Sequence, residues 1–473
     1  MTSLAPKYND NLESGFDLIR PAHKKHEKCE NLKSTNPQDF RVIPIDYSWS
    51  FSNKTQKDTA YITHSYYTYP AKFIPQLASR LIKEYSKPLD LVLDPFMGSG
   101  TTMVEALVHN RHCIGTDINE IAYLVAKVKT TPLDIARLKQ EFSALSLALS
   151  NDKTHSLFAQ NKSLKELKLR KNENLLPKNE RIDYWFKPKQ KDELNVILAC
   201  ILDIENKDIQ DFYLVAFAQI LKTCSIWLQK SIKPTRDLHK KEVDCYALFL
   251  AQAKKMIKKH EQFNQMLNEN ILKNASKYLK VLCGDSRHLP LQDNEVSLIV
   301  TSPPYVTSYE YADLHQLPSL WLGFLDNLSE FRKKFIGSSF KERETLLTSA
   351  NLQSKIAQNI IAQLKEKKAQ EVQNYYADML ESFAEMYRVL KPKAKACIVI
   401  GNTEFGGVEI LNAEVFAEQM QNIGFKMCNI IHREIPSKML PSTRDSKTGR
   451  FAKTQNTDKL VYPTEYILIM EKQ

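Results

Sequence analysis

Residues 91–105 read Leu-Val-Leu-Asp-Pro-Phe-Met-Gly-Ser-Gly-Thr-Thr-Met-Val-Glu, and this stretch decides the fold. It opens with a short apolar run that ends in Asp94, as expected of a buried parallel strand. Gly98 and Gly100 permit positive backbone dihedrals and the close approach of a ligand, and Thr101 can begin a helix. A glycine turn before a helix N-terminus presents free N–H groups to a polar ligand. The stretch therefore predicts a strand–turn–helix unit that holds a nucleoside-like cofactor.

A second apolar run, residues 113–116, ends in Asp117, about 20 residues beyond the glycine turn. In dinucleotide folds a strand-end carboxylate at this spacing binds ribose hydroxyls. No Gly-Lys-Ser/Thr follows the turn, and the fingerprint Gly-x-Gly-x-x-Gly is absent. We therefore expect neither a phosphate-cradling loop nor a nicotinamide site.

A third informative string, Thr-Ser-Pro-Pro-Tyr at 301–305, follows the strand-like run 296–300. Acceptors aimed at an exocyclic amine favour the pyramidal form, whose lone pair can attack an electrophilic methyl group. The Ser302 hydroxyl and the Pro303 carbonyl are such acceptors, and two consecutive prolines fix the backbone. Tyr305 offers a flat face for a base flipped out of a duplex. The string is therefore suited to accept hydrogen bonds from the amine of a nucleobase.

Both strings resemble those of one family, the S-adenosylmethionine-dependent DNA amino-methyltransferases. Residues 94–102 resemble its motif I and residues 301–305 its motif IV, while 69–75 and 281–285 resemble motifs X and III. The resemblance implies S-adenosylmethionine (AdoMet) as cofactor and no metal. It assigns cofactor binding to Lys72, Phe73, Asp94, Pro95, Phe96, Gly98, Gly100, Thr101, Asp117 and Asp285. It assigns the catalytic part to Ser302, Pro303, Pro304 and Tyr305.

The first residue of motif IV bears on the target base. Serine at this position is typical of the cytosine-N4 branch of the family, whereas aspartate or asparagine is typical of the adenine-N6 branch. Cytosine-C5 methylation would need a Pro-Cys nucleophile, and no cysteine here follows a proline. We expect a cytosine-N4 methyltransferase, with adenine-N6 methylation as the alternative. An RNA base methyltransferase and a catalytically silent nucleic-acid-binding protein are weaker alternatives.

The order of strand-like and helix-like segments predicts an α/β fold: a Rossmann-like, doubly wound methyltransferase sheet with a large, mainly helical insertion. Residues 1–45 are polar and lysine-rich and are interpreted as an arm. Residues 46–130 form the first part of the methyltransferase domain and 131–279 the insertion. Residues 280–473 complete the domain and include a basic loop at 436–459.

Three regions are candidates for reading DNA. The first is the insertion, where Tyr184-Trp185-Phe186 is ambiguous between core and base stacking, and where basic residues gather. These are Lys222, Lys230, Lys233, Arg236, His239, Lys240 and Lys241. The second is the segment 306–340, with Tyr309 and Tyr311 close to motif IV. The third is the loop 436–459, with Lys438, Arg444, Lys447, Arg450 and Lys453.

The composition agrees with a nucleic-acid partner. The 473 residues include 66 Lys+Arg against 55 Asp+Glu, a formal net charge of +11. Eight cysteines show no Cys-x-x-Cys spacing, which argues against zinc and a disulfide scaffold. No apolar run approaches the ~20 residues of a membrane span. We expect a cytoplasmic protein that acts on double-stranded DNA, with a cognate restriction endonuclease as a candidate partner.

Overall fold

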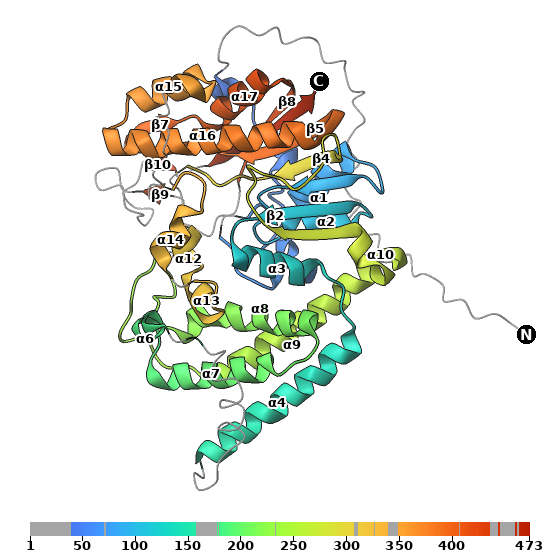
Figure 1. The fold of residues 1–473 in the computed structure, drawn as a ribbon, viewed down its shortest axis with the longest axis vertical. Coiled ribbons are helices and arrows are strands. Elements are labelled where there is room, and N and C mark those ends of the chain that lie inside the picture. The colour runs from blue at the N-terminus through green and yellow to red at the C-terminus, as the bar shows by residue number, and fades with distance from the viewer. Residues whose placement is uncertain are drawn as a thin grey trace, which may run out of the picture. The chain divides into compact units, whose positions relative to one another are not determined.

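Seven strands form a mixed sheet in the computed structural model of the protein (Figure 1). They are β1 (Leu91–Asp94), β2 (His112–Asp117), β3 (Leu279–Cys283), β4 (Val296–Thr301), β5 (Leu390–Ile400), β8 (Phe425–Glu434) and β11 (Thr464–Lys472). Their order is β3-β2-β1-β4-β5-β11-β8. The first five are parallel, and β11 runs antiparallel to both of its neighbours. The strands expected at 91–94, 113–116 and 296–300 are therefore present as β1, β2 and β4.

The structure describes residues 39–70, 72–157, 177, 179–231, 233–306, 311–325, 327–338, 349–405, 407–435, 443–444, 459–460 and 463–473. These ranges exclude most of the predicted arm, Tyr309, and nearly all of the basic loop 436–459 with Lys438, Lys447, Arg450 and Lys453. Of that loop, only β9 (Thr443–Arg444) and β10 (Lys459–Leu460) are described, as an antiparallel pair.

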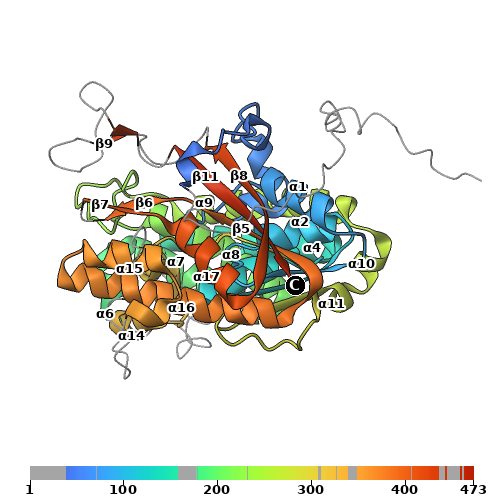
Figure 2. The same cartoon turned by 90° about the horizontal axis from the view of Figure 1, so that it is seen from above.

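Side chains alternate along the strands between two apolar layers, as the two-residue period of a strand requires. Val92 of β1 and Leu298 of β4 face one layer, whereas Leu93 and Ile299 face the other. The first layer contains α1 (Pro75–Tyr85), α2 (Thr101–Val108) and α3 (Glu120–Thr130). The second contains α15 (Lys355–Ala362), α16 (Glu366–Val389) and α17 (Asn412–Ile423). Helices cover both faces, which confirms the predicted doubly wound α/β fold (Figure 2).

Between β2 and β3, beyond α3, the chain forms further helices, most of which share a core of their own. They are α4 (Ile135–Leu157), α6 (Glu180–Trp185), α7 (Pro188–Leu202), α8 (Lys207–Cys224), α9 (Cys245–Met266), α10 (Glu269–Lys273) and α11 (Ala275–Tyr278). The apolar residues that recur at helical spacing in 194–201 and 212–221 are buried in this core. It also receives α13 (Gln316–Trp321), which follows α12 (Tyr311–Leu314) and precedes α14 (Leu328–Lys333). Figure 1 shows these helices beside the sheet, with α3 between the two.

Short 3-10 helices and a small hairpin complete the described fold. The 3-10 helices are η2 (Phe40–Val42), η3 (Tyr47–Trp49), η4 (Asp58–Ala60), η5 (Ile62–Ser65) and η7 (Ser349–Leu352). The hairpin pairs β6 (Thr403–Phe405) with β7 (Val408–Ile410). Phe40 is buried edge-to-face against Tyr466 of β11, and Ile45 bridges to His432 of β8. Residues 39–45, at the end of the predicted arm, thus lie against β8 and β11.

Within the described ranges, each helix is too short or too polar to span a lipid bilayer.

Candidate active site

A cavity of about 840 Å³, counting the space at its open mouth, lies at the carboxyl ends of β1, β2 and β4. Ligands gather at this edge in open α/β sheets. Most of the residues predicted for the site line the cavity: Lys72, Phe73, Asp94, Pro95, Phe96, Gly98, Thr101, Asp117, Asp285, Ser302 and Pro304. Three others, Gly100, Pro303 and Tyr305, are not on its wall. The fold thus brings together residues from five separate stretches of the chain.

The glycine turn has the predicted backbone. Gly98 has a φ of 46° and Gly100 a φ of 73°, both in the left-handed region that favours glycine. A Cβ on Gly100 would lie 3.0 Å from the Cβ of Ala126 on α3, so glycine also allows α2 and α3 to pack closely. The Gly100 N–H donates to the Met97 carbonyl at 2.7 Å, which closes the turn before α2 begins.

Asp117 at the end of β2 ties the turn to the sheet. One of its carboxylate oxygens accepts from the Gly98 N–H and the other from the Asn119 N–H, each at 2.9 Å. Burial raises the pKa of Asp117 to about 6, although these backbone hydrogen bonds act in the opposite direction. Each oxygen retains a lone pair beyond these two bonds, so Asp117 can still accept from the hydroxyls of a sugar.

Two hydroxyls in the cavity wall are suited to a polar ligand. Ser99 is 2% exposed and Thr101 is 4% exposed, and both line the cavity. Among the described residues, neither side-chain oxygen has a hydrogen-bond partner. Because a buried hydroxyl without a partner is unfavourable, such groups are expected to bind something. Together with the glycine turn, they fit a nucleoside cofactor such as AdoMet.

Buried ionisable side chains support the turn from behind, and two of them, Lys129 and Glu105, were not among the residues predicted from the sequence. The Lys129 ammonium on α3 donates to the Ser99 carbonyl of the turn. Nearby, His64 Nε2 lies 2.8 Å from Glu105 Oε1, and Lys72 donates to the His64 carbonyl at 2.7 Å. Burial raises the pKa of Glu105 to about 7 and lowers the pKa of Lys72 to about 8. Of this cluster only Lys72 lines the cavity, and the other three side chains lie behind its wall.

Asp285, after β3, is held by an arginine. The Arg287 guanidinium donates to both oxygens of Asp285, with an Nη2–Oδ2 distance of 2.6 Å, and its Nη1 lies 2.7 Å from Oδ1 of Asp378 on α16. Burial opposes ionisation of Asp285, but Arg287 outweighs it and lowers the pKa of this carboxyl. Asp378 also accepts from the Gly337 N–H at 3.0 Å. The network fixes the segment whose residues 334–336 form another wall of the cavity.

The Thr-Ser-Pro-Pro-Tyr string is anchored on both sides of its central residues. The Thr301 hydroxyl donates to Asp94 Oδ1 at 2.6 Å, and the Tyr375 hydroxyl donates to the Pro304 carbonyl at 2.7 Å. Between these anchors lie the Ser302 hydroxyl and the Pro303 carbonyl, which accept no hydrogen bond from the part of the chain that the structure describes. The loop is therefore rigid while two acceptors remain available beside the cavity.

Asp94 itself is part of this anchoring. Burial raises its pKa to about 6, while the hydrogen bond from Thr301 favours the ionised form. The carboxyl joins the end of β1 to the end of β4, and it also accepts from the Phe96 N–H at 3.1 Å. Its position explains why an acid at this point of motif I shapes the loop.

Tyr305 leaves the cavity and packs against the neighbouring strands. Its hydroxyl donates to Glu465 Oε2 at 3.1 Å, and Glu465 forms a buried ion pair with Arg433. A Cβ on Gly401 would lie 3.2 Å from the Tyr305 ring, so the Gly401 backbone lies against this side chain. The ring is only partly buried and is held in one orientation.

Several residues of the cavity wall were not among the predicted site residues. They are Tyr69, Pro70, Met97, Ser99, Ile118, Gly284, Ser286, Lys334, Phe335 and Ile336. Most are neighbours of predicted residues, and a window around each motif would include them. Residues 334–336 are different, because no local pattern indicates that they return to the cofactor cavity. In the described ranges, no group of three or more His, Cys, Asp or Glu side chains is placed to hold a metal ion.

The sequence matches two models of DNA methyltransferase families. A family model described as DNA methylase, for N6 and N4 methyltransferases, matches residues 7–128 and 296–473, more than half of the chain. A model for D12 class N6 adenine-specific DNA methyltransferases matches residues 73–197.

Individual relatives agree. The chain is 27% identical to the type II methyltransferase M.MvaI of Kocuria varians over 436 residues, 87% of this chain and 92% of that protein. It is 25% identical to the type II methyltransferase M.MjaII of Methanocaldococcus jannaschii, over 63% of this chain and 70% of that protein. Among solved structures, TrmN from Thermus thermophilus aligns with 85% of this chain and 49% of its own, at 10% identity and a TM-score of 0.28, too low to add to the assignment. The family match decides: the chain belongs to the DNA methylase family, and its methyl donor is AdoMet.

Proposed function

We propose that the protein transfers a methyl group from AdoMet to the N4 amino group of cytosine in duplex DNA. The observation that carries this proposal is the pair of acceptors at Ser302 and Pro303, placed between two anchored residues beside the cofactor cavity. In this proposal both acceptors bind the base amine as it approaches the methyl donor.

AdoMet, when bound, supplies an electrophilic methyl group on a sulfonium. The Asp117 carboxylate accepts from its ribose hydroxyls, and the turn at Gly98 and Gly100 lets the backbone approach it closely. Lys72 and Phe73, which line the cavity, contact its methionine part. Asp285 is the acceptor assigned to the adenine amino group, and it would have to share with that group the two oxygens to which Arg287 donates. The remaining lining residues exclude water from the reacting atoms.

The target amine is a poor nucleophile because its lone pair is delocalised into the ring. Hydrogen bonds to Ser302 and Pro303 favour a pyramidal nitrogen, and the anchored loop holds these acceptors in place before the base arrives. The flipped base stacks on the Tyr305 ring, which Glu465 orients. The proton is lost to solvent after direct transfer, so the reaction needs no covalent intermediate.

Adenine-N6 is the second candidate target. The match to the D12 class of adenine-specific enzymes favours it. That match spans residues 73–197, which hold the glycine turn and part of the insertion but not Ser302. The serine at the first position of the amine-binding string remains the reason to place cytosine-N4 first.

The relatives named above are type II methyltransferases, and we infer the same setting here. In this role the enzyme methylates a short duplex sequence and so protects it from a cognate restriction endonuclease. The polyanionic substrate agrees with the net charge of +11.

Methylation of an unmodified duplex with methyl-labelled AdoMet, followed by mass spectrometry of the nucleosides, tests the proposal. We expect N4-methylcytosine. N6-methyladenine would support the second candidate. Label found in RNA alone would show that RNA, and not DNA, is the substrate. No incorporation into DNA while AdoMet binds would indicate a catalytically silent nucleic-acid-binding protein.

The role of Ser302 has its own test. Ser302→Ala should lower the turnover number by about 100-fold or more, as for other preorganised polar groups, with the AdoMet dissociation constant unchanged. Ser297→Ala, near the opposite end of β4, is the matched control, since that hydroxyl bonds Lys391 at the surface. Equal losses of turnover and of AdoMet binding in Ser302→Ala would refute the role in orienting the amine.

A further inference from the structure

An open groove lies on the helical insertion, apart from the cofactor cavity. It is lined by Glu180, Arg181, Tyr184, Trp185, Pro234 and Arg236, with a volume of about 1060 Å³ including open space. One wall is α6, and the other is the loop 225–244 that joins α8 to α9, called here the α8–α9 loop. We refer to this feature as the α6 groove.

In this groove the guanidinium of Arg236 lies over the aromatic ring of Tyr184. The Arg236 guanidinium carbon lies 4.0 Å from the centre of the Tyr184 ring, and the Tyr184 side chain is 48% exposed. The Tyr184 ring meets the buried Trp185 edge-to-face, and Trp185 in turn stacks on Trp227 with ring centres 5.2 Å apart. Because stacking restricts the guanidinium, its N–H donors are ordered before a ligand binds.

Two lysines, Lys222 of α8 and Lys240 of the loop itself, hold the α8–α9 loop through hydrogen bonds to backbone carbonyls. The Lys222 ammonium donates to the Ser231 carbonyl at 2.9 Å, and the Lys240 ammonium donates to the carbonyls of Lys222 and Trp227, each at 2.8 Å. Burial lowers the pKa of both lysines. These two side chains therefore hold the loop in shape. The other basic residues of the predicted cluster are exposed: Lys230, Lys233, Arg236, His239 and Lys241.

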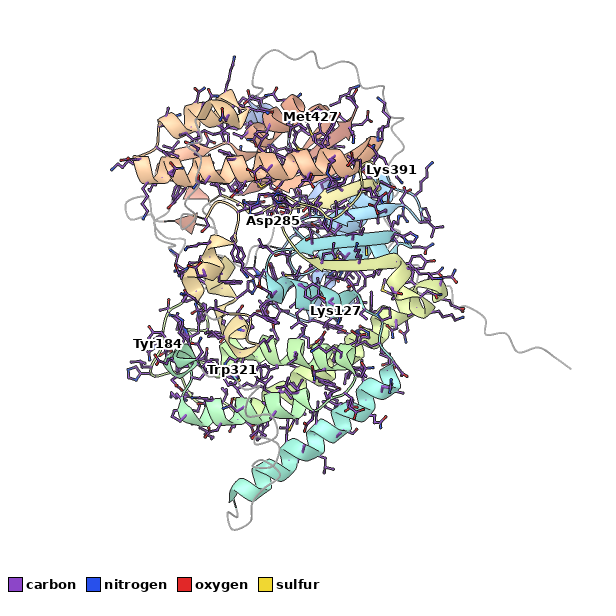
Figure 3. The ribbon with its side chains drawn as sticks, viewed as in Figure 1. Lys127, Tyr184, Asp285, Trp321, Lys391 and Met427 are labelled. Atoms are coloured by element: carbon purple, nitrogen blue, oxygen red, sulfur yellow. The ribbon has the colours of Figure 1, made fainter. Side chains whose placement is uncertain are left out.

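The groove is joined to the cofactor cavity by two consecutive residues. Gln316 Oε1 accepts from Arg181 at 3.0 Å and from Trp185 at 3.1 Å. The ring of His315, next to Gln316, lies 4.7 Å from the ring of Tyr69, which lines the cavity. Figure 3 shows Tyr184 on α6 at the lower left of the view, with Asp285 near the centre and Lys391 at the upper right.

We propose that the α6 groove and the α8–α9 loop hold the sugar-phosphate backbone of the duplex DNA beside the methylation site. A rigid loop that presents several cations, with one guanidinium ordered by stacking, fits a row of phosphates. Arg236 and Lys233 are the cations that contact them. This inference rests on the proposed function, because it takes duplex DNA as the substrate.

Binding of a fluorescein-labelled, unmethylated duplex, measured by anisotropy over a series of KCl concentrations, tests the inference. Arg236→Ala and Lys233→Ala should each weaken binding of two duplexes of unrelated sequence by the same factor, about 10-fold for Arg236. Each change should lower the slope of log affinity against log salt by about 0.9. Glu180→Gln, which removes the only acid in the wall of the α6 groove among the described residues, should strengthen binding.

Lys273→Ala is the matched control. This lysine is 70% exposed on α10, which Figures 1 and 2 place at the opposite end of the helical part from α6. It should leave both affinity and salt slope unchanged, and all variants should bind AdoMet as the wild type does.

The outcomes separate the inference from the proposed function. A wild-type protein that binds AdoMet but neither binds nor methylates DNA refutes the proposed function. A wild-type protein that methylates DNA, with Arg236→Ala and Lys233→Ala binding as well as Lys273→Ala, refutes only the backbone contact. Weaker binding of one duplex sequence alone would also refute it, because that result indicates a contact with bases.

Discussion

Asp117 is the residue whose replacement tests the cofactor site most directly. Its two oxygens already accept the N–H groups of Gly98 and Asn119 at 2.9 Å, and they have lone pairs left for the ribose hydroxyls. Asp117→Ala removes all of these acceptors. Asp117→Asn keeps the shape, but its amide group has to point N–H donors at one of the two backbone N–H groups. Both variants should therefore bind AdoMet more weakly.

The expected size follows from the hydrogen bonds that are lost. A hydrogen bond to a charged group contributes about 1.5–3 kcal/mol, so loss of one bond weakens binding about 10-fold to 150-fold. Loss of the Gly98 contact loosens the turn as well, which places Asp117→Ala at the upper end of that range. Asp293→Asn, a residue 69% exposed in the turn that precedes β4, is the matched control and should bind normally.

The pH dependence gives a second readout of the same residue. Burial raises the pKa of Asp117 to about 6 in the ligand-free protein, and ribose hydroxyls bind its ionised form. The part of the AdoMet affinity that depends on Asp117 should be constant above pH 7 and should fall as the pH drops below about 6. Asp94, whose pKa is also raised to about 6, contributes to this fall, so the part due to Asp117 is the part that Asp117→Asn removes.

Isothermal titration calorimetry with AdoMet measures these affinities, and circular dichroism establishes that each variant is folded. A folded Asp117→Ala variant that binds AdoMet as tightly as the wild type would refute the ribose assignment. An unchanged pH profile in Asp117→Asn would refute the link between its ionisation and binding.

Three further predictions concern the surroundings of the turn. Gly100→Ala places a side chain at a φ of 73° and 3.0 Å from Ala126 Cβ, and should lower the free energy of unfolding by about 2 kcal/mol or more; an unchanged urea midpoint would contradict this. The pKa of Glu105 is raised from 4.5 to about 7, so the wild type loses stability as the pH rises from about 4.5 to about 7, and Glu105→Gln should not. Between pH 5 and 8 the variant should gain up to about 3 kcal/mol on the wild type, and parallel stability curves would argue against a buried acid. Lys129→Met removes the donor to the Ser99 carbonyl, so AdoMet should bind about 10-fold more weakly. The urea midpoint should change little, because the same substitution removes a buried amine. Unchanged binding would show that the hydrogen bond from Lys129 is not needed to shape the turn.

The strands and the glycine turn were predictable because their signals are local. Short apolar runs before Asp94 and Asp117 specify buried parallel strands, and a left-handed backbone at Gly98 requires what only glycine provides cheaply. Element ends were less predictable. The apolar spacing typical of a helix starts only at Tyr376, but α16 begins at Glu366, and the apolar run 396–400 is shorter than β5, which begins at Leu390. Backbone hydrogen bonds, which need no apolar side chain, extend both elements beyond their apolar pattern.

The basic cluster of the insertion shows where local signals end. In the sequence, Lys222, Lys240 and Arg236 are equivalent cations. In the structure the first two donate to backbone carbonyls within the fold, while Arg236 lies on the exposed Tyr184 ring. A lysine stem is long enough to point either way, and only the surrounding backbone decides which donor it satisfies.

The sequence by itself determined the fold class, the cofactor turn and the string that suits a base amine, since each depends on residues that are neighbours in the chain. The tertiary structure alone decided which distant groups complete the site. Lys129 reaches Ser99, Tyr375 fixes Pro304, and Asp378 joins Arg287 to the cavity wall. These partners lie 30 to 91 residues apart, and a hydrogen bond between them leaves no period or spacing in the sequence. They are determined only when the helices pack on the sheet and bring one donor and one acceptor together.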